Sequence, residues 1–387
     1  MTIKLPVYLD YNATTPVDKR VLAEMLPYFC ENFGNAASTT HSFGNQALAG
    51  VSRARQQIAS LINAKSDEII FTSGATESDN IALLGVAERY AYKGDHIITC
   101  VTEHKAVLDS AKRLEQLGKR VTYLPVDRYG QINLDQLRAA ITPQTILISI
   151  MAANNEIGTL APLREIGRIA REHGIIFHTD GAQYTGHLPL DVEALNIDLL
   201  SISAHKLYGP KGIGALYVRK DNPRVSVAPV IFGGGHEQGI RSGTLNVPAI
   251  VGFGAAAELC QAELAEEAQR LRGYCAKILR ELSQAIEGVE LNGHPSERLP
   301  HNLNISIKGT RSSDFTGLLG DIAISAGSAC NTANPNPSHV ICALGFGNDR
   351  ALSSLRISLG RTTTLEEVDY AIGRIIEASK VLQLVAC

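Results

Sequence analysis

One lysine of this chain, Lys206, directly follows an apolar run, residues 198–203, that is typical of a buried strand. The glycine-rich segment 207–214 comes next and predicts a tight turn. Burial disfavours the charged form of a lysine, and a desolvated lysine with a lowered pKa is the nucleophile that forms a Schiff base with an aldehyde. The alternative is a surface lysine just past a strand, the commoner case for an arbitrary lysine. The other polar residues of the sequence decide between the two interpretations.

Short apolar runs alternate with amphipathic stretches between residues 65 and 220, a pattern that predicts βαβ units and a mostly parallel sheet buried on both faces. Ligands of such sheets bind just beyond the carboxyl ends of the strands. Polar clusters follow five of the predicted strands, so we expect them to lie on one edge of the sheet and to form one site. The clusters are Ser73–Thr76, Glu103–His104, Asn154–Glu156, Asp180 with Gln183, and Ser203–Lys206.

Three of these clusters suit separate parts of pyridoxal phosphate. Residues 73–76 join a strand to a helix start, where free N–H groups and the helix dipole attract a phosphate, although simple capping of the helix explains them equally well. Asp180 ends a strand, and a buried carboxylate there would pair with the ring nitrogen, unless it caps the turn that follows. His104 would lie on the ring and shuttle protons; a hydrogen-bonded histidine at a strand end is the alternative.

Two residues of the C-terminal part point to the substrate and its chemistry. Arg356 lies in a predicted strand, and its planar guanidinium grips a carboxylate such as that of an amino acid, unless it forms a structural ion pair. Cys330 follows a run of small residues and precedes residues 331–338, whose Asn, Pro and Ser content predicts a mobile loop. An exposed cysteine on such a loop is expected to be reactive, and its thiolate would reach a distant substrate atom.

The length and the pattern of the chain predict two domains. Its 387 residues exceed one ordinary core, and a nearly continuous helical pattern from residue 248 to 286 would bridge two cores. We place a large cofactor-binding domain at residues 13–260, and a small α/β domain at residues 261–387 together with residues 1–12. The predicted strands of the small domain lie at residues 288–291, 303–307, 321–325 and 355–359.

The composition restricts the partners and the compartment. The net charge is −3 with mixed signs, which gives no electrostatic footprint for nucleic acid or for an anionic membrane. No apolar run approaches the roughly 20 residues of a membrane helix, and the N-terminus has no signal-peptide core. Seven scattered cysteines without a C-x-x-C pair speak against a disulfide framework or a zinc site. We therefore expect a cytoplasmic protein that binds neither nucleic acid nor membrane and holds no metal.

An ordered set of motifs resembles the cysteine desulfurases of the iron–sulfur cluster type, which are pyridoxal-phosphate enzymes of fold type I in the class-V aminotransferase group. The resemblance covers residues 7 to 375, and the long segment around Cys330 favours the mobile-loop subgroup. The fold that it implies is a large domain with a mostly parallel central sheet between helices, plus a smaller C-terminal α/β domain. The motifs are Tyr8–Pro16, Phe33–Asn35, His41–Gly44, Thr102–Lys105, Asn154–Gly158, Ser203–Lys206, Arg241–Thr244 and Ser325–Cys330.

The resemblance also implies a reaction and a set of residue roles. A homodimer would take sulfur from L-cysteine, leave L-alanine and pass a persulfide to an acceptor protein such as an iron–sulfur scaffold. Lys206, Cys330 and His104 would be catalytic, with Lys206 holding pyridoxal 5′-phosphate and abstracting the substrate α-proton. Asn35, Asn155 and Arg356 would bind the substrate. The cofactor would contact Ala75, Thr76, His104, Asn155, Asp180, Gln183, Ser203, His205, Lys206 and, across the dimer, Thr244.

Two other functions stay open. The nearest is an aminotransferase, or a cysteine or selenocysteine lyase, on the same fold; it needs Lys206 and Asp180 but makes no use of Cys330. The second is a non-catalytic binding protein that keeps the fold. The presence of the lysine, the aspartate, Arg356 and the loop cysteine in one chain favours the desulfurase.

Overall fold

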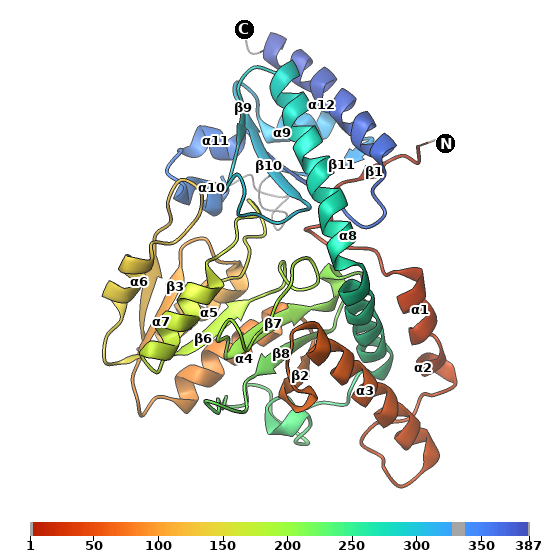
Figure 1. Cartoon of the computed structure of the whole chain (residues 1–387), viewed down its shortest axis with the longest axis vertical. Helices are drawn as coiled ribbons and strands as arrows, with labels where there is room; N and C mark the ends of the chain where they lie inside the picture. The colour runs from red at the N-terminus through yellow and green to blue at the C-terminus, as the bar shows by residue number, and fades with distance from the viewer. Residues whose placement is uncertain (1–2, 327–336, 386–387) are drawn as a thin grey trace.

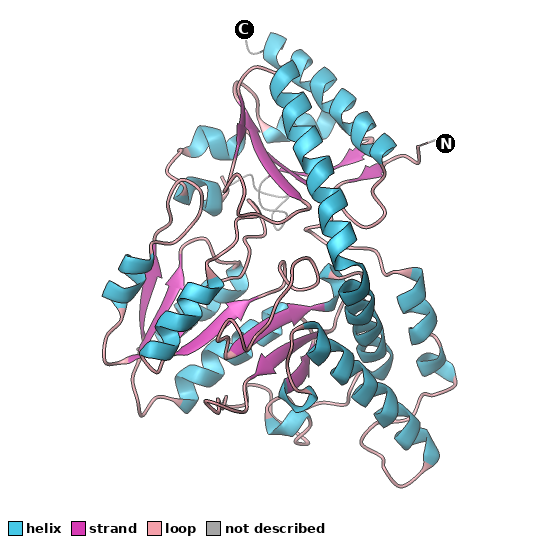
Figure 2. Cartoon of the chain, viewed as in Figure 1, coloured by secondary structure: helices cyan, strands magenta, loops and turns pink. Residues whose placement is uncertain are grey.

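The computed structural model describes residues 3–326 and 337–385, so Cys330 lies outside the described residues. Two sheets lie at opposite ends of the molecule, and one long helix, α8 (Val247–Ala285), runs past both of them (Figures 1 and 2). The larger sheet occupies the lower part of Figure 1 and the smaller sheet the upper part. The α/β class predicted from the sequence is confirmed.

The larger sheet has seven strands in the order β2-β8-β7-β6-β5-β3-β4. β8 is antiparallel to both of its neighbours, and the remaining pairs are parallel. Because β8 runs against both β2 and β7, these two run the same way, and β2, β3, β5, β6 and β7 all end at one edge of the sheet. The predicted mostly parallel sheet is confirmed. Its strands are β2 (Ile69–Thr72), β3 (His96–Cys100), β4 (Arg120–Leu124), β5 (Thr145–Ser149), β6 (Ile176–Asp180), β7 (Leu199–Ser203) and β8 (Gly214–Val218).

Helices cover both faces of this sheet, which explains why its strands are apolar along most of their length. Successive residues of a strand point to opposite faces. Thus Ile97 belongs to a core formed with α4 and α5, whereas its neighbour Ile98 belongs to a core formed with α3 and α7. The helices of this part are α1 (Lys19–Met25), α2 (Pro27–Cys30), α3 (Ser42–Leu61), α4 (Ala75–Arg89), α5 (Lys105–Gln116), α6 (Leu134–Ala140) and α7 (Leu163–Glu172).

The smaller sheet has four antiparallel strands in the order β12-β13-β10-β9. The start of the chain also reaches this part, because β1 pairs in parallel with β11. The prediction of one strand over residues 321–325 was wrong, since the chain changes its pairing partner at Ile324 and contributes β11 and β12 to different sheets. The elements are β1 (Val7–Tyr8), β9 (Val289–Leu291), β10 (Asn302–Ile307), β11 (Ile322–Ala323), β12 (Ser325–Ala326), β13 (Ser354–Ser358), α9 (Ser312–Leu318), α10 (His339–Ala343), α11 (Asn348–Leu352) and α12 (Leu365–Val385).

The 39 residues of α8 connect two hydrophobic cores. Residues 247–260 pack with the larger sheet and α3, and residues 271–282 pack with β10, β13 and α12. α8 is long and apolar enough to cross a membrane by length and composition, but 61% of its most apolar window is buried inside the protein. The predicted helix over residues 248–286 is confirmed. The domain boundary at residue 260 falls within this helix and stays a prediction.

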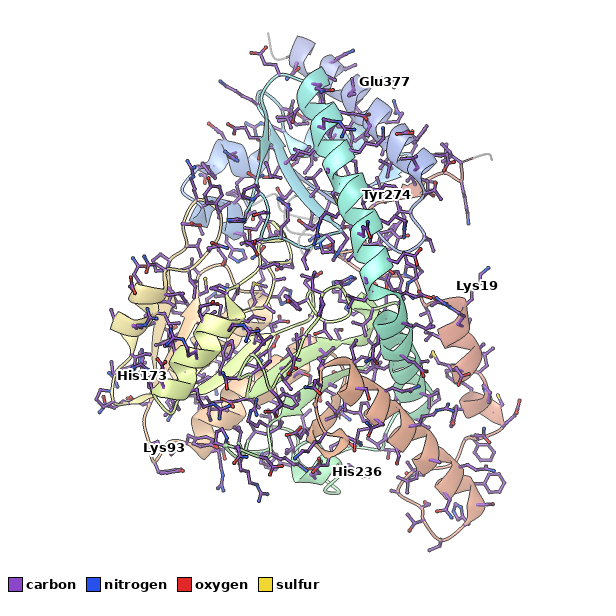
Figure 3. All side chains as sticks on the ribbon, viewed as in Figure 1. Lys19, Lys93, His173, His236, Tyr274 and Glu377 are labelled. Atoms are coloured by element: carbon purple, nitrogen blue, oxygen red, sulfur yellow. The ribbon has the colours of Figure 1, made fainter. Side chains whose placement is uncertain are left out.

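Charged side chains such as Lys19, Lys93 and Glu377 are exposed and point away from the body of the molecule (Figure 3). The region between the two sheets has a different composition. Polar side chains from both parts of the chain line a cavity there. This cavity is where the sequence places the candidate site.

Candidate active site

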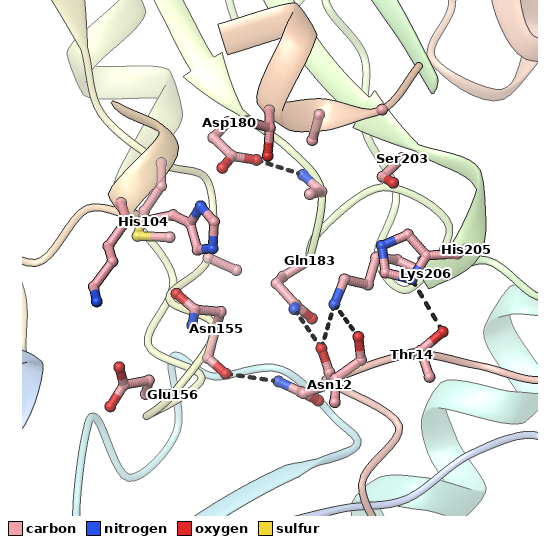
Figure 4. Close-up of a pocket in the computed structure, with 18 of the residues that line it drawn as sticks. Asn12, Thr14, His104, Asn155, Glu156, Asp180, Gln183, Ser203, His205 and Lys206 are labelled. Atoms are coloured by element: carbon pink, nitrogen blue, oxygen red, sulfur yellow. Dashed lines mark hydrogen bonds between the residues drawn. The ribbon is translucent and has the colours of Figure 1, made fainter. Parts of the chain in front are cut away.

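A cavity of about 590 Å³ opens at the carboxyl edge of the larger sheet, on the side that faces the smaller sheet (Figure 4). Each of the five clusters predicted from the sequence contributes side chains to its wall. The common direction of β2, β3, β5, β6 and β7 brings the clusters to this edge, as expected for open α/β sheets. The predicted residues that line the cavity are Ala75, Thr76, His104, Asn155, Asp180, Gln183, Ser203, His205, Lys206 and Arg356.

The first turn of α4 forms the end of the cavity that suits a phosphate. α4 begins at Ala75 after Gly74, whose φ of 154° favours glycine, and no side chain caps the helix. The alternative of simple capping is therefore removed, and the amides of Ala75 and Thr76, which have no acceptor within the helix, stay available to an anion. Sequence reasoning missed Gly214 in β8: a Cβ there would lie 2.6 Å from the Cα atom of Gly74. Only glycine at residue 214 permits this close approach of the two backbones.

Ser203 and His205 follow β7 and line the same cavity. The Nδ1 atom of His205 lies 3.1 Å from the Oγ1 atom of Thr14. Burial, with the charges of Lys206 and Lys211, lowers the pKa of His205 to about 4. His205 is therefore neutral at pH 7 and offers a hydrogen bond, rather than a positive charge, to a bound anion.

Asp180 ends β6 at the floor of the cavity. Its Oδ1 atom accepts a hydrogen bond from the backbone N–H of Ala182 at 2.9 Å, so it stabilises the turn that follows. It also lines the cavity (Figure 4). Asp180 therefore has both the turn contact and the position in the cavity that the two interpretations of the sequence required. Burial raises the pKa of Asp180, whereas the nearby His104 and Lys206 act in the opposite direction. A cation bound in the cavity would further favour the ionised carboxylate.

Three titratable side chains are buried close to Asp180. Glu103 belongs to a cluster predicted from the sequence, whereas sequence reasoning missed Asp79 and His178. Asp79 of α4 has no exposed surface, neither of its carboxylate oxygens has a hydrogen-bond partner, and its Oδ1 atom lies 3.5 Å from the Nε2 atom of His178. Burial and the charge of Asp180 raise the pKa of Asp79 well above its usual value, and burial does the same for Glu103. Burial lowers the pKa of His178 to about 3. Burial therefore disfavours the charged form of all three groups, and Asp180 differs from them because the nearby His104 and Lys206 favour its ionised carboxylate.

A sequence signal existed for His178, because it stands two residues before Asp180 on one strand and therefore on the same face of the sheet. Its ring nitrogens lie 2.8 Å from Ser149 Oγ and 3.0 Å from Ser201 Oγ. These contacts connect β6 to the neighbouring β5 and β7. No comparable signal existed for Asp79, since it stands in the middle of a predicted helix.

The ammonium group of Lys206 is held by the N-terminal segment. Lys206 lies on the short turn η2 (Ala204–Lys206), is partly buried, and donates from Nζ to the carbonyls of Asn12 and Ala13, at 2.5 and 2.8 Å (Figure 4). Gln183 Nε2 donates to the same carbonyl of Asn12 at 3.0 Å. The Oδ1 atom of Asn12 and the Oε1 atom of Gln183 are buried and have no hydrogen-bond partner in the described part of the chain, which indicates room for a polar ligand beside them. Sequence reasoning quoted this segment as a motif but assigned it no contact.

Arg356 reaches the cavity from β13 and is only 2% exposed. Its Nη2 atom donates to Asp10 Oδ1 at 2.9 Å, and its Nη1 atom donates to the backbone carbonyl of Asn155 at 3.0 Å. The ion pair that was the alternative interpretation is therefore present. The position in the cavity that a substrate-binding arginine requires is present as well.

Three predicted site residues are not brought to the cavity by the described chain. Asn35 and Thr244 are exposed and do not line it; the resemblance assigns Thr244 to the site of the other subunit. Cys330 lies outside the described residues. His339, nine residues after Cys330, does line the cavity, and sequence reasoning missed it. Its nearness in sequence to Cys330 was the available signal.

Comparisons with known proteins agree with this fold and site. Residues 7–371 match the family model Aminotransferase class-V. The chain is 51% identical to the cysteine desulfurase IscS of Anaeromyxobacter sp. (strain Fw109-5), over 98% of this chain and 94% of that protein. A solved structure named NifS-like protein matches with a TM-score of 0.90 and 39% identity, over 97% of this chain and 99% of the other. A second structure, SspA in complex with cysteine, matches with a TM-score of 0.81 and 40% identity, over 91% and 98% of the two chains.

The fold and the cavity define a pyridoxal-phosphate-dependent enzyme with a mostly parallel α/β core, consistent with fold type I. The chain belongs to the cysteine desulfurases of the class-V aminotransferase family. The resemblance predicted from the sequence motifs is thereby confirmed.

Proposed function

We propose that this protein converts L-cysteine to L-alanine and carries the removed sulfur as a persulfide on Cys330. The observation that carries the proposal is the meeting of Lys206, Asp180 and Arg356 in one cavity of a chain of this family. A lysine for an aldehyde, a carboxylate for a ring nitrogen and an arginine for a substrate carboxylate are what such a reaction needs. The structure named SspA in complex with cysteine supports cysteine as the substrate.

The residues present fit pyridoxal phosphate. The uncapped start of α4 suits its phosphate, and Asp180 suits its ring nitrogen. The unpartnered Oδ1 of Asn12 and Oε1 of Gln183 mark a part of the cavity wall where polar groups of a ligand find partners. When bound, the cofactor withdraws electrons from the α-carbon of the substrate. We propose the same contacts as the resemblance implies for His104, Ser203 and His205.

The chain's own groups supply the remaining steps. Arg356 and Asn155 hold the carboxylate of cysteine, and Lys206, released from the carbonyls of Asn12 and Ala13, moves the proton of the α-carbon. The thiolate of Cys330 attacks the substrate sulfur. An S–S bond forms as the C–S bond breaks, and the electron pair stays with the β-carbon, which takes a proton to give alanine. The persulfide then passes to a thiol of an acceptor protein.

We propose that the enzyme acts as a cytoplasmic homodimer, with Thr244 completing the cofactor site of the other subunit. Phe29 on α2, Phe33 on the segment that follows it and Phe43 on α3 are 56, 64 and 48% exposed, and the ring centroids of Phe33 and Phe43 lie 5.4 Å apart, which supports a second copy. Large exposed apolar side chains that lie together mark interaction sites. The acceptor is a sulfur-carrying protein such as an iron–sulfur scaffold.

Replacement of Cys330 tests the proposal. Cys330→Ala is expected to abolish alanine formation from cysteine while the absorbance of the bound cofactor stays unchanged. Cys30→Ala, at an exposed cysteine of the described chain, is the control and should keep full turnover. Alanine formation by Cys330→Ala at the normal rate would contradict the persulfide step and favour a lyase. Transfer of the amino group to a keto acid would favour an aminotransferase, and absence of any bound chromophore after addition of pyridoxal phosphate would favour a non-catalytic protein.

A further inference from the structure

Asp10 lies beside Arg356 although the two residues are 346 positions apart in the sequence. The segment that follows β1 is fixed to β13 by a bridge between Asp10 and Ser358, and the backbone N–H of Asn12 donates to Ser358 Oγ at 2.9 Å. Ser358 stands two residues after Arg356, so both side chains belong to the same face of β13. The backbone therefore delivers the carboxylate of Asp10 to the guanidinium of Arg356.

The guanidinium of Arg356 is held on several sides. Nη2 donates to Asp10 Oδ1 at 2.9 Å and to Ser325 Oγ at 3.1 Å, and Nη1 donates to the carbonyl of Asn155 at 3.0 Å. Its Nε atom is buried and has no hydrogen-bond partner among residues 3–326 and 337–385. Arginine carries five N–H donors in a rigid plane, so these contacts fix the plane while donors remain for a ligand.

Asp10 differs from the other two partners because it carries a charge. Within the described ranges 3–326 and 337–385, its carboxylate forms the one ion pair of Arg356. It is itself fixed, since Ser325 Oγ donates to its Oδ1 at 2.9 Å. A buried guanidinium that loses its charged partner pays a desolvation penalty and turns toward water or toward other acceptors. The orientation of Arg356 therefore depends on Asp10 more than on either neutral acceptor.

We infer that Asp10 is a positioning residue, which fixes the guanidinium plane of Arg356 so that its remaining donors meet the α-carboxylate of cysteine. This inference rests on the proposed role of Arg356 in holding that carboxylate. Asp10 acts through the Oδ1 acceptor, and it takes no part in the breaking of bonds. Its loss should therefore weaken cysteine binding and leave the chemistry of bound cysteine unchanged.

The test is steady-state kinetics of the loaded enzyme with L-cysteine. Asp10→Ala should raise KM about tenfold, the effect of losing one charged hydrogen bond, with kcat changed by less than about twofold. Asp10→Asn keeps an oxygen acceptor at the same place and should restore KM to within about threefold of the original value. Asp135→Ala, at an aspartate whose side chain is 90% exposed, is the matched control and should change neither constant.

Cysteamine, which is cysteine without the carboxylate, separates positioning from general damage. Its dissociation constant, measured through the cofactor absorbance, should be the same in the original enzyme and in Asp10→Ala. Equal loss of cysteamine and cysteine binding would overturn the inference, as would an unchanged KM in Asp10→Ala. A KM below the original value in Asp10→Asn would also overturn it, because Asp10 would then compete with the substrate. Arg356→Gln tests the proposed function separately: an unchanged KM there would remove the role of Arg356 itself.

Discussion

Two parts of the cavity wall hold their charged side chains in different surroundings. We call the group of Asp180 with its neighbours Asp79 and Glu103, together with Lys206 and the start of α4, the floor, and Arg356 with Asp10 the rim. At the floor, Asp79, Glu103 and Asp180 lie together, and within the described part of the chain none of them forms an ion pair with a lysine or arginine. At the rim, the buried Arg356 is paired with Asp10 at 2.9 Å. Burial raises the pKa of each floor carboxyl, and the nearby His104 and Lys206 act against it at Asp180 alone. At the rim, the ion pair with Asp10 offsets the burial of Arg356. This difference suits the floor to a cationic group and the rim to an anionic group, as the proposed function requires.

The largest loss of activity is expected from replacement of Lys206, which contacts the N-terminal segment at Asn12 and Ala13. Lys206→Ala removes the amine that, in the proposed reaction, moves the substrate proton, and should lower kcat at least about a thousandfold, the upper part of the range for a positioned acid or base. Alanine formation measures the loss, and reduction with borohydride should then attach no cofactor to the chain. Substantial turnover by this variant would show that the floor does not supply the reacting amine.

A pair of substitutions at the floor tests whether the surroundings of Asp180 favour its ionised form over that of Asp79. Asp180→Asn removes the charge that pairs with a bound cation and should lower kcat about a hundredfold, as for loss of one partner of a buried pair. Asp79→Asn keeps the size of a side chain whose charged form is disfavoured by burial, and should change kcat by less than about threefold. The rates of alanine formation by the two variants are the measurements to compare. Similar losses in both variants would mean that the two carboxyls share the charge.

The phosphate end of the floor depends on a close backbone approach, so Gly214→Ala should weaken it. A Cβ at residue 214 would lie 2.5 Å from the carbonyl oxygen of Ile202 and 2.6 Å from Gly74 Cα. We expect the dissociation constant of pyridoxal phosphate to rise about tenfold and the free energy of unfolding to fall by about 1–3 kcal/mol. Fluorescence titration and urea unfolding measure these changes. Gly273→Ala is the control, because nothing lies within 4 Å of the Cβ built there.

The smallest effect concerns the pH dependence of the floor. The pKa of His178 is about 3 in the folded protein and about 6.5 in an unfolded chain, so the unfolded state binds a proton that the native state does not. The contribution of His178 to the free energy of unfolding is therefore fully present above pH 6.5. It decreases as the pH falls toward 3, by up to about 1.4 kcal/mol per pH unit. His178→Gln should therefore lose less stability than the original protein between pH 7 and pH 5. Equal losses in urea unfolding at the two pH values would contradict this assignment.

Much of the floor was predictable because its polar side chains lie at the ends of strands. Asp180, Ser203 and Lys206 each follow an apolar run, and parallel strands bring such positions to one edge. Asp79 was not predictable, since a polar residue in the middle of a helix gives no sign of facing a sheet. The fold class and the long helix over residues 248–286 followed from periodicity and length.

The rim was harder to predict, because it joins three distant segments of the chain. Arg356 could be assigned from its residue type, but its partner Asp10 and the backbone carbonyl of Asn155 depend on tertiary contacts. The split of residues 321–325 between β11 and β12 depends on the same contacts, since β1 arrives there from the N-terminus. Local patterns of sequence do not encode pairings of this kind.

The continuous helix α8 fixes how far the part of the chain that carries the rim is rotated relative to the part that carries the floor. Its residues 247–260 belong to the core beneath the floor, and its residues 271–282 belong to the core beneath the rim. Each residue of an α-helix adds about 1.5 Å of length and about 100° of rotation. A single inserted or deleted residue between these two parts would therefore turn Arg356 away from Lys206, even though no site residue had changed. The number of residues in this stretch is thus as much a determinant of the active site as the side chains themselves.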